Sequence, residues 1–179
     1  MINLPPKNPM AMPSQPHISL KEYLATGFRP DREFIDGVIV ERNVGTIEHS
    51  RLQALMIGWF VSEECNWRVA SFIGCRLQVS PTRVRVPDVL LTTRKPHPDV
   101  LIEPPVLVVE VLSPEDDPME LRRRATDYFS MGVSAVWIVD PIARAGHWSS
   151  GDVWTQADRL KVPGTLIYVD LLPMFARLA

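Results

Sequence analysis

A nearly continuous run of apolar, mostly β-branched residues at 105–113, PVLVVEVLS, constrains the fold more than any other feature of the sequence. This composition is typical of a strand that is covered on both faces of a sheet. The segment 117–132 then has the spacing of an amphipathic helix, and 133–141, VSAVWIVDP, is another buried strand. Strand, helix and strand within about thirty-five residues form a βαβ unit, so we expect the two strands to be parallel neighbours.

The flanking sequence predicts further helices and strands around this unit. A short helix is expected over 19–27, with Ser19 as N-cap, Glu22 completing a capping box and Gly27 as terminator. The remaining expected elements are a hairpin over 33–42 with its turn at Asp36-Gly37, a helix over 46–64, strands over 69–79 and 83–91, a terminal hairpin over 145–162, a strand near LIYVDL, and a short amphipathic helix to Ala179. Together they predict one α/β domain over residues 18–179, with a central mixed β-sheet flanked by helices.

Composition limits the class of protein. Of the 179 residues, 46% are hydrophobic and 22% charged, which is ordinary for a globular domain. No apolar run approaches the roughly 18 residues of a membrane span, and residues 1–17 read as a flexible Pro-rich tail without the apolar core of a signal peptide. We therefore expect a soluble cytoplasmic protein. The net charge of −2 provides no strongly basic footprint for nucleic acid.

Two carboxylates interrupt the apolar strands. Glu110 lies within VLVVEVL and Asp88 within VRVPDVLL, and an ionised carboxylate in such surroundings is costly unless it is paired. If the two strands are adjacent, both side chains can converge on one point, where a cation would relieve their repulsion. Hard oxygen ligands favour Mg²⁺ or Mn²⁺, which suit phosphodiester hydrolysis. The competing interpretation is structural, with Glu110 paired to Arg85 or Arg124.

These residues also carry a resemblance to a known family. Pro87-Asp88 followed by Glu110-Val111-Leu112 resembles the PD-(D/E)XK nuclease superfamily. The chain as a whole resembles the Uma-type family of restriction-endonuclease-like proteins over about residues 18–175. The segments that carry this resemblance are, in order, EFIDGVIVE, TIEHSRLQALM, VRVPDVLL, LVVEVLSP, RATDYFSMGV and AVWIVDP.

The resemblance implies a restriction-endonuclease-like core with one divalent-metal site. Asp88 and Glu110 match the metal-binding carboxylates, and the backbone carbonyl of Val111 would be a further ligand. Glu33 matches a family glutamate that could lie by the metal or bind one of its waters; its alternative role is a surface residue opening a hairpin. His49 matches a family histidine that either lines the site or contacts phosphate, against the alternative of a packing residue on its helix.

One position departs from the family pattern. The superfamily lysine belongs two residues after Glu110, where this chain has Leu112, and in the Uma-type pattern it has moved to the following helix, where this chain has Arg124. Arginine stays charged at any relevant pH and cannot serve as a base, but it can stabilise a phosphoryl transition state. Arg124 is thus expected either to bind the scissile phosphate or only to pair with Glu110. We also expect Arg85 and Ser113 to line the site.

Three functions remain open from the sequence. The first is a metal-dependent DNA endonuclease, acting as a homodimer because two-fold paired sites cut both strands. The second is a nuclease fold without activity that binds nucleic acid or a protein. In the third, the carboxylates are purely structural, and an electropositive groove leading to Asp88 would argue against it.

Overall fold

The structure is a computed structural model that describes residues 17–43, 45–151 and 153–178. Except for His17, the expected N-terminal tail lies outside the described residues. A six-stranded sheet forms the centre, in the spatial order β10, β9, β8, β7, β6, β3. Its strands are β3 (Val69–Ile73), β6 (Val89–Thr93), β7 (Leu107–Val111), β8 (Ala135–Asp140), β9 (Ala145–Ser149) and β10 (Thr155–Gln156).

The βαβ unit is confirmed. β7 and β8 pair in parallel, all other pairs of the central sheet are antiparallel, and α3 (Pro118–Met131) connects the two. Asp117 caps the start of α3, and Gly132 ends it with a left-handed φ of 104°, a conformation that glycine adopts without strain. The mixed sheet is therefore built around this unit, as the sequence predicts.

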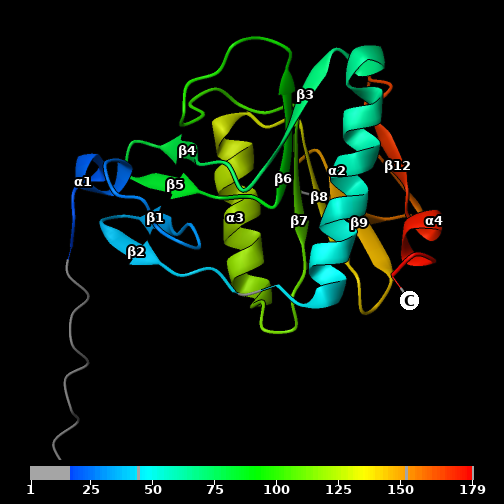
Figure 1. Ribbon diagram of the computed structural model, residues 1–179, viewed down its shortest axis with the longest axis horizontal. Helices are drawn as coiled ribbons and strands as arrows, with labels where there is room; N and C mark the ends of the chain where they lie inside the picture. Colours follow the sequence, from blue (N-terminus) through cyan, green and yellow to red (C-terminus); the bar gives the residue numbers. More distant parts are fainter. Residues whose placement is uncertain (1–16, 44, 152, 179) are drawn as a thin grey trace, which may run out of the picture.

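Helices cover both faces of the central sheet. The central strands run between α3 on one side and α2 (Ile47–Trp67) on the other (Figure 1). Val109 and Val111 of β7 pack in the core cluster that contains α2, whereas Val108 packs in the cluster that contains Tyr128 of α3. This alternation is the period of a strand, and it turns Glu110 toward α3.

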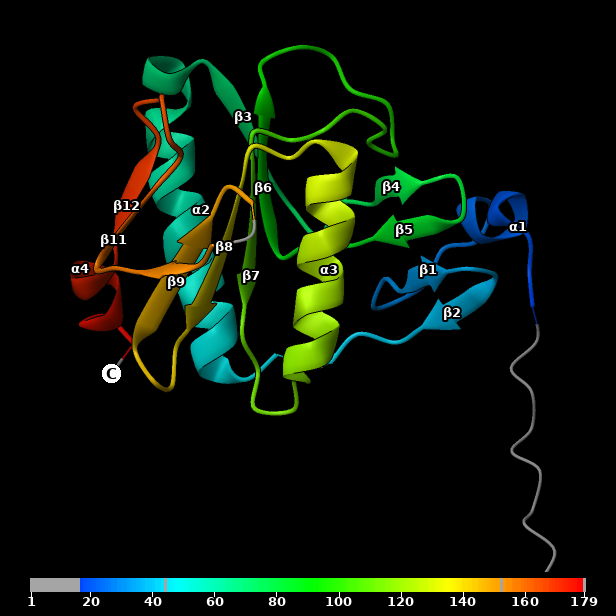
Figure 2. The same ribbon diagram turned by 180° about the vertical axis from the view of Figure 1, so that it is seen from behind.

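A second, four-stranded sheet lies on the α3 side, seen from behind in Figure 2. Its order is β2 (Val38–Val40), β1 (Glu33–Ile35), β5 (Arg83–Arg85), β4 (Leu77–Ser80), and β1 and β2 form the expected hairpin. The predictions of single strands over 69–79 and 83–91 are wrong, because each segment is divided between the two sheets. Gly74, with φ of 58°, breaks the first, and Pro87, which has no N–H for a ladder, breaks the second.

The ends of the domain differ in detail from expectation. The capping box of Ser19 and Glu22 is present, but α1 (Leu20–Leu24) ends at Ala25 and not at Gly27. The expected hairpin over 145–162 is divided, because β9 pairs with β10 whereas β11 (Arg159–Lys161) pairs with β12 (Tyr168–Asp170). The expected strand near LIYVDL and the helix after it are present as β12 and α4 (Leu171–Phe175). Within the described residues, no helix is long and apolar enough to cross a membrane.

Candidate active site

Asp88 and Glu110 lie opposite each other on neighbouring strands. β6 and β7 are antiparallel with Val89 facing Val109, so Asp88, just before β6, comes opposite Glu110. The backbone N–H of Val111 donates a 2.9 Å hydrogen bond to Oδ2 of Asp88. The two strands are therefore adjacent, as a convergence of the two carboxylates requires.

An arginine and a histidine contact the Asp88 carboxylate. Nη2 of Arg42 lies 2.6 Å from Oδ1, and Nε2 of His49 lies 3.2 Å from Oδ2. Burial by itself raises the pKa of Asp88, but the His49 hydrogen bond, the Arg42 charge and the Val111 N–H outweigh it and hold the pKa below its usual range. Asp88 is thus ionised, and both of its oxygens already have partners.

Glu110 has a different environment on the same edge. Its side chain is buried, Tyr128 donates a 2.5 Å hydrogen bond to Oε1, and Nη1 of Arg124 lies 3.5 Å from Oε2. Burial is the main cause that raises the pKa of Glu110 to about 7, with Asp88 adding to it and Arg124 and Tyr128 opposing it. The two carboxylates therefore differ in charge near neutral pH, a pattern common at functional sites.

The start of α2 positions His49 beside Asp88. Thr46 caps this helix by accepting a 3.2 Å hydrogen bond from the His49 N–H. One turn later, the side chain of Gln53 donates to the backbone oxygen of Asp88 at 2.8 Å. Burial opposes protonation of His49, yet the hydrogen bond and charge of Asp88 outweigh it and raise the histidine pKa. His49 therefore contacts Asp88 and lines the cavity at that residue, in addition to packing on its helix.

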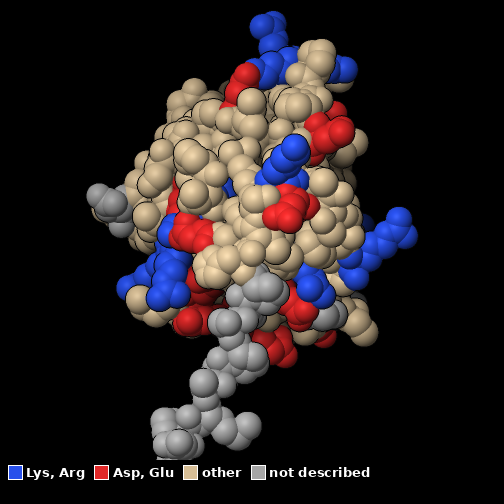
Figure 3. Space-filling model, turned by 90° about the vertical axis from the view of Figure 1, so that its left-hand side faces the viewer, with Lys and Arg blue, Asp and Glu red and all other residues tan. Residues whose placement is uncertain are grey.

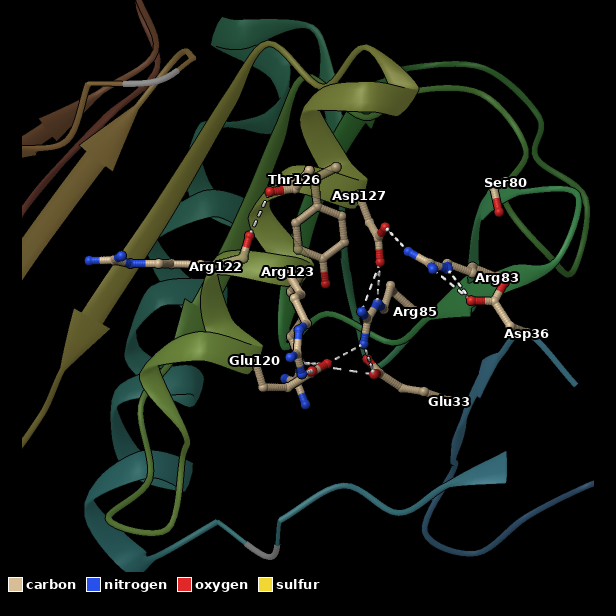
Figure 4. A network of polar contacts seen from close by, with 12 residues as sticks. Glu33, Asp36, Ser80, Arg83, Arg85, Glu120, Arg122, Arg123, Thr126 and Asp127 are labelled. Carbon is tan, nitrogen blue, oxygen red and sulfur yellow. Dashed lines mark hydrogen bonds and ion pairs between the residues drawn. The ribbon is translucent and has the colours of Figure 1, made fainter. Parts of the chain in front are cut away.

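Glu33 and Arg85 lie behind the carboxylate pair. Glu33 is fully buried; it accepts from Nη1 of Arg85 at 2.7 Å and from the N–H of Val86 at 3.1 Å, and it lies 3.9 Å from Nε of Arg124. Glu33 is thus not the surface residue of the alternative interpretation. Arg85 pairs with three carboxylates (Figure 4). Among the described residues it pairs with neither Asp88 nor Glu110, so of the two alternative partners of Glu110 it is Arg124 that contacts it.

A small cavity of about 20 Å³ lies at Asp88, large enough for about one water molecule or ion. A shallow depression of about 200 Å³ shares Asn43, Asp116 and Arg124 with it and forms an approach. The lining residues of the cavity are Arg42, Asn43, His49, Asp88, Val111, Ser113, Asp116 and Arg124. Five of the residues expected at the site, including Ser113, therefore line it, whereas Glu110 does not line it but lies 3.5 Å from Arg124, which does.

Sequence reasoning missed three participants. Arg42 and Gln53 were not singled out, and no local pattern marks them. Tyr128 was not singled out either, although a buried tyrosine hydroxyl needs a hydrogen-bond partner, and that rule points to a nearby carboxylate.

The donor set suits a hard divalent cation. Asp88 supplies carboxylate oxygens to a cavity of the size of one ion, and Glu110 lies opposite Asp88 on β7 without lining that cavity. No group of three His, Cys, Asp or Glu side chains suited to a metal occurs within residues 17–43, 45–151 and 153–178. A cation here would therefore keep several waters, as Mg²⁺ commonly does. It would also have to replace Arg42 at Oδ1 of Asp88.

The surface beside the small sheet is mixed in charge. Lys and Arg side chains lie next to Asp and Glu on the face shown in Figure 3, in place of a continuous basic surface. The electropositive groove that would separate the nucleic-acid functions from a purely structural role is thus not seen on that face.

Comparison with solved structures supports the fold. The chain is similar to the crystal structure of a protein from Anabaena variabilis described as "a putative nuclease belonging to DUF820", with a TM-score of 0.80 and 19% identity. The match covers 90% of this chain and 99% of the other. Two chains this far apart in sequence share the architecture, and the restriction-endonuclease-like α/β fold is thereby confirmed.

Comparison with family models gives a match along most of the chain. No curated protein matches the chain. The model of the Uma2 family, described as "Putative restriction endonuclease", matches residues 20–178, which include both carboxylates and the α3 helix. The chain belongs to the Uma2 family.

Proposed function

We propose that this protein is a metal-dependent endonuclease that hydrolyses phosphodiester bonds of DNA with water as the nucleophile. One observation carries the proposal: Asp88 lines a cavity of the size of one ion and lies opposite Glu110 across β6 and β7, and Arg124 lines the same cavity 3.5 Å from Glu110. Membership of a family described as restriction endonucleases supports a nucleic acid as the substrate.

The carboxylates would hold Mg²⁺ or Mn²⁺, together with the backbone carbonyl of Val111. The bound ion would activate a water molecule and neutralise charge that develops on the phosphate. His49 keeps Asp88 ionised and oriented through its 3.2 Å contact. Glu33 supports the same segment from behind, because it accepts from the N–H of Val86, two residues before Asp88.

Arg124 supplies the positive charge for the scissile phosphate. Its side chain is 13% exposed, lines both the cavity and its approach, and carries an Nε–H that has no hydrogen-bond acceptor among the described residues. A buried donor without an acceptor is costly, so this guanidinium is not fully satisfied by its own carboxylates. A phosphate oxygen that reaches the part of the guanidinium lining the cavity would gain a strong charge-assisted hydrogen bond. Because arginine stays protonated, this role is electrostatic and involves no proton transfer.

The proposal extends to assembly and location. A homodimer would place two such sites against the two strands of a duplex, which requires two-fold symmetry. We propose the cytoplasm as the place where this chain meets DNA.

Two observations favour a second function. Both oxygens of Asp88 are engaged, by Arg42 at 2.6 Å and by His49 at 3.2 Å, and arginine stands where the Uma-type pattern has lysine. A nuclease fold that binds nucleic acid or protein without cleaving would have this internally neutralised site. The two proposals differ in whether a divalent cation binds.

The test combines cation binding with cleavage. Wild-type protein is titrated calorimetrically with Mg²⁺ and Mn²⁺ beside Asp88→Ala and Glu110→Ala, and all are then assayed on supercoiled plasmid. The matched control is Asp99→Ala, at an exposed aspartate away from the site. Binding and nicking that disappear only in the two site variants are expected. Wild-type protein that binds no cation would overturn the catalytic proposal and favour the binding module.

A further inference from the structure

Arg85 is the centre of a buried ion-pair network beside the candidate site. The side chain is 1% exposed, and its Nη1 lies 2.7 Å from both Oε2 of Glu33 and Oε1 of Glu120. Its Nε and Nη2 each lie 2.8 Å from Oδ2 of Asp127. Figure 4 shows this guanidinium between the small sheet, which carries Glu33, and helix α3, which carries Glu120 and Asp127.

Arg124 extends from the same stretch of α3 but is held loosely. Its guanidinium lies 3.9 Å from Glu33, 4.0 Å from Glu120 and 3.5 Å from Glu110. All three distances exceed those of good hydrogen bonds, and the buried Nε has no acceptor among the described residues. Two arginines therefore share the carboxylates Glu33 and Glu120, and Arg85 has the short contacts.

We propose that Arg85 is a positioning residue that keeps Arg124 directed to the active site by occupying Glu33 and Glu120. The inference rests on the proposed role of Arg124 toward phosphate. It adds the reason why Arg124 is not already engaged in short ion pairs with the buried carboxylates. A guanidinium locked by two short buried ion pairs would lose those contacts on reaching for a substrate. A guanidinium with three long contacts loses little interaction energy when it moves to a substrate.

The geometry indicates what happens when the Arg85 charge is removed. Glu33 cannot follow a new partner, because its Oε1 is fixed by the 3.1 Å hydrogen bond from the N–H of Val86. A buried carboxylate without a cation is strongly destabilised, and Arg124 is the nearest remaining guanidinium to Glu33. Arg124 therefore moves onto Glu33, away from Glu110 and the cavity.

The first test follows the Arg124 side chain directly. The Nε–H resonance of Arg124, assigned by its loss in Arg124→Lys, is recorded by NMR in metal-free protein without substrate. In Arg85→Gln we expect this proton to shift downfield and to exchange with water more slowly, as it becomes hydrogen-bonded to Glu33. Arg85→Lys, which retains the charge, is expected to shift it less. An unchanged resonance in Arg85→Gln would overturn the inference.

A matched control separates competition from general loosening of the network. Arg83 joins the same network through Asp36 and Asp127, but among the described residues it contacts neither Glu33 nor Glu120. Arg83→Gln should leave the Arg124 resonance in place, and an equal shift there would overturn the inference. If Arg85→Gln fails to fold, Arg85→Gln with Asp127→Asn removes one unpaired carboxylate and still leaves Glu33 and Glu120 to compete for Arg124.

The second test measures DNA affinity in a double-mutant cycle. Arg85→Gln is expected to weaken duplex binding about tenfold, and to add nothing when Arg124 is already alanine. Equal losses in both backgrounds would mean that Arg85 does not act through Arg124. If Arg124→Ala itself leaves affinity unchanged, or the wild type binds no DNA, the proposed function fails, while the resonance still decides the role of Arg85.

Discussion

The hydroxyl of Tyr128 donates a 2.5 Å hydrogen bond to Oε1 of Glu110, and both side chains are buried between α3 and the central sheet. This bond joins the helix that carries Arg124 to the strand that carries the second carboxylate of the site. It also opposes the rise in the Glu110 pKa, because it favours the ionised carboxylate.

Tyr128→Phe is expected to lower the free energy of unfolding by about 2 kcal/mol, the range for a hydrogen bond to a charged group. Urea denaturation measures the change. Tyr168→Phe is the control, because its hydroxyl makes no hydrogen bond within the described residues. Equal losses in the two variants would mean that the Tyr128 hydroxyl contributes nothing specific.

Stability without metal should depend on pH through Glu110. Its folded-state pKa of about 7 lies above the ordinary glutamate value of 4.5, so its contribution to stability is fully present below about pH 4.5 and is lost as pH rises through 7. Glu110→Gln mimics the protonated form. The free energy of unfolding of this variant should therefore rise relative to that of wild type between pH 5 and pH 8, by roughly 3 kcal/mol at most.

Asp88→Asn should show the opposite pH dependence of stability in the same experiment. The pKa of Asp88 is lowered from 3.8, so its contribution is present at neutral pH and is lost as pH falls below that value. This variant should be most destabilised relative to wild type near pH 7 and less so in acid. Unfolding curves of both variants and wild type are measured in EDTA across the pH range. If the stability changes of Glu110→Gln and Asp88→Asn had the same pH profile, the difference between the two carboxylate environments would be contradicted.

Removing Arg42 should strengthen cation binding. Arg42 occupies Oδ1 of Asp88 at 2.6 Å, so a divalent cation competes with it. We expect Arg42→Gln to lower the calorimetric Kd for Mg²⁺ roughly tenfold, about 1.4 kcal/mol. Arg32→Gln, which removes an exposed pair with Glu41, is the control and should change little. Weaker binding in Arg42→Gln would show that this arginine supports the cation site.

Replacing Arg124 by lysine restores the Uma-type pattern. A lysine can lose its proton in a buried site and assist water activation, which arginine cannot do. Arg124→Lys is therefore expected to raise the rate of plasmid cleavage in Mg²⁺ at least about tenfold, within the range for general acid–base catalysis. Arg124→Ala should abolish cleavage. A lysine variant slower than wild type would indicate that the guanidinium is the working group here.

Much of this protein could be predicted from local sequence. The βαβ unit follows from the β-branched run at 105–113 and the helix with Gly132 behind it, because strand and helix periodicities are properties of neighbouring residues. The sequence also indicated that Asp88 and Glu110 each need a partner, because an ionised carboxylate in an apolar strand is costly without one. The family resemblance then indicated His49 and Arg124 as residues of the same site.

Only the tertiary structure decided how these groups are connected. Two predicted strands are divided between two sheets at Gly74 and Pro87, and the second break releases Asp88 from the ladder. Arg42 reaches Asp88 from 46 residues away, and Arg85 reaches Glu33 from 52 residues away. Such contacts depend on where separate elements pack, and ion pairs form between whichever charges burial brings together. The sequence determined that two buried carboxylates need cations, and packing determined which arginines supply them and which one remains loosely held.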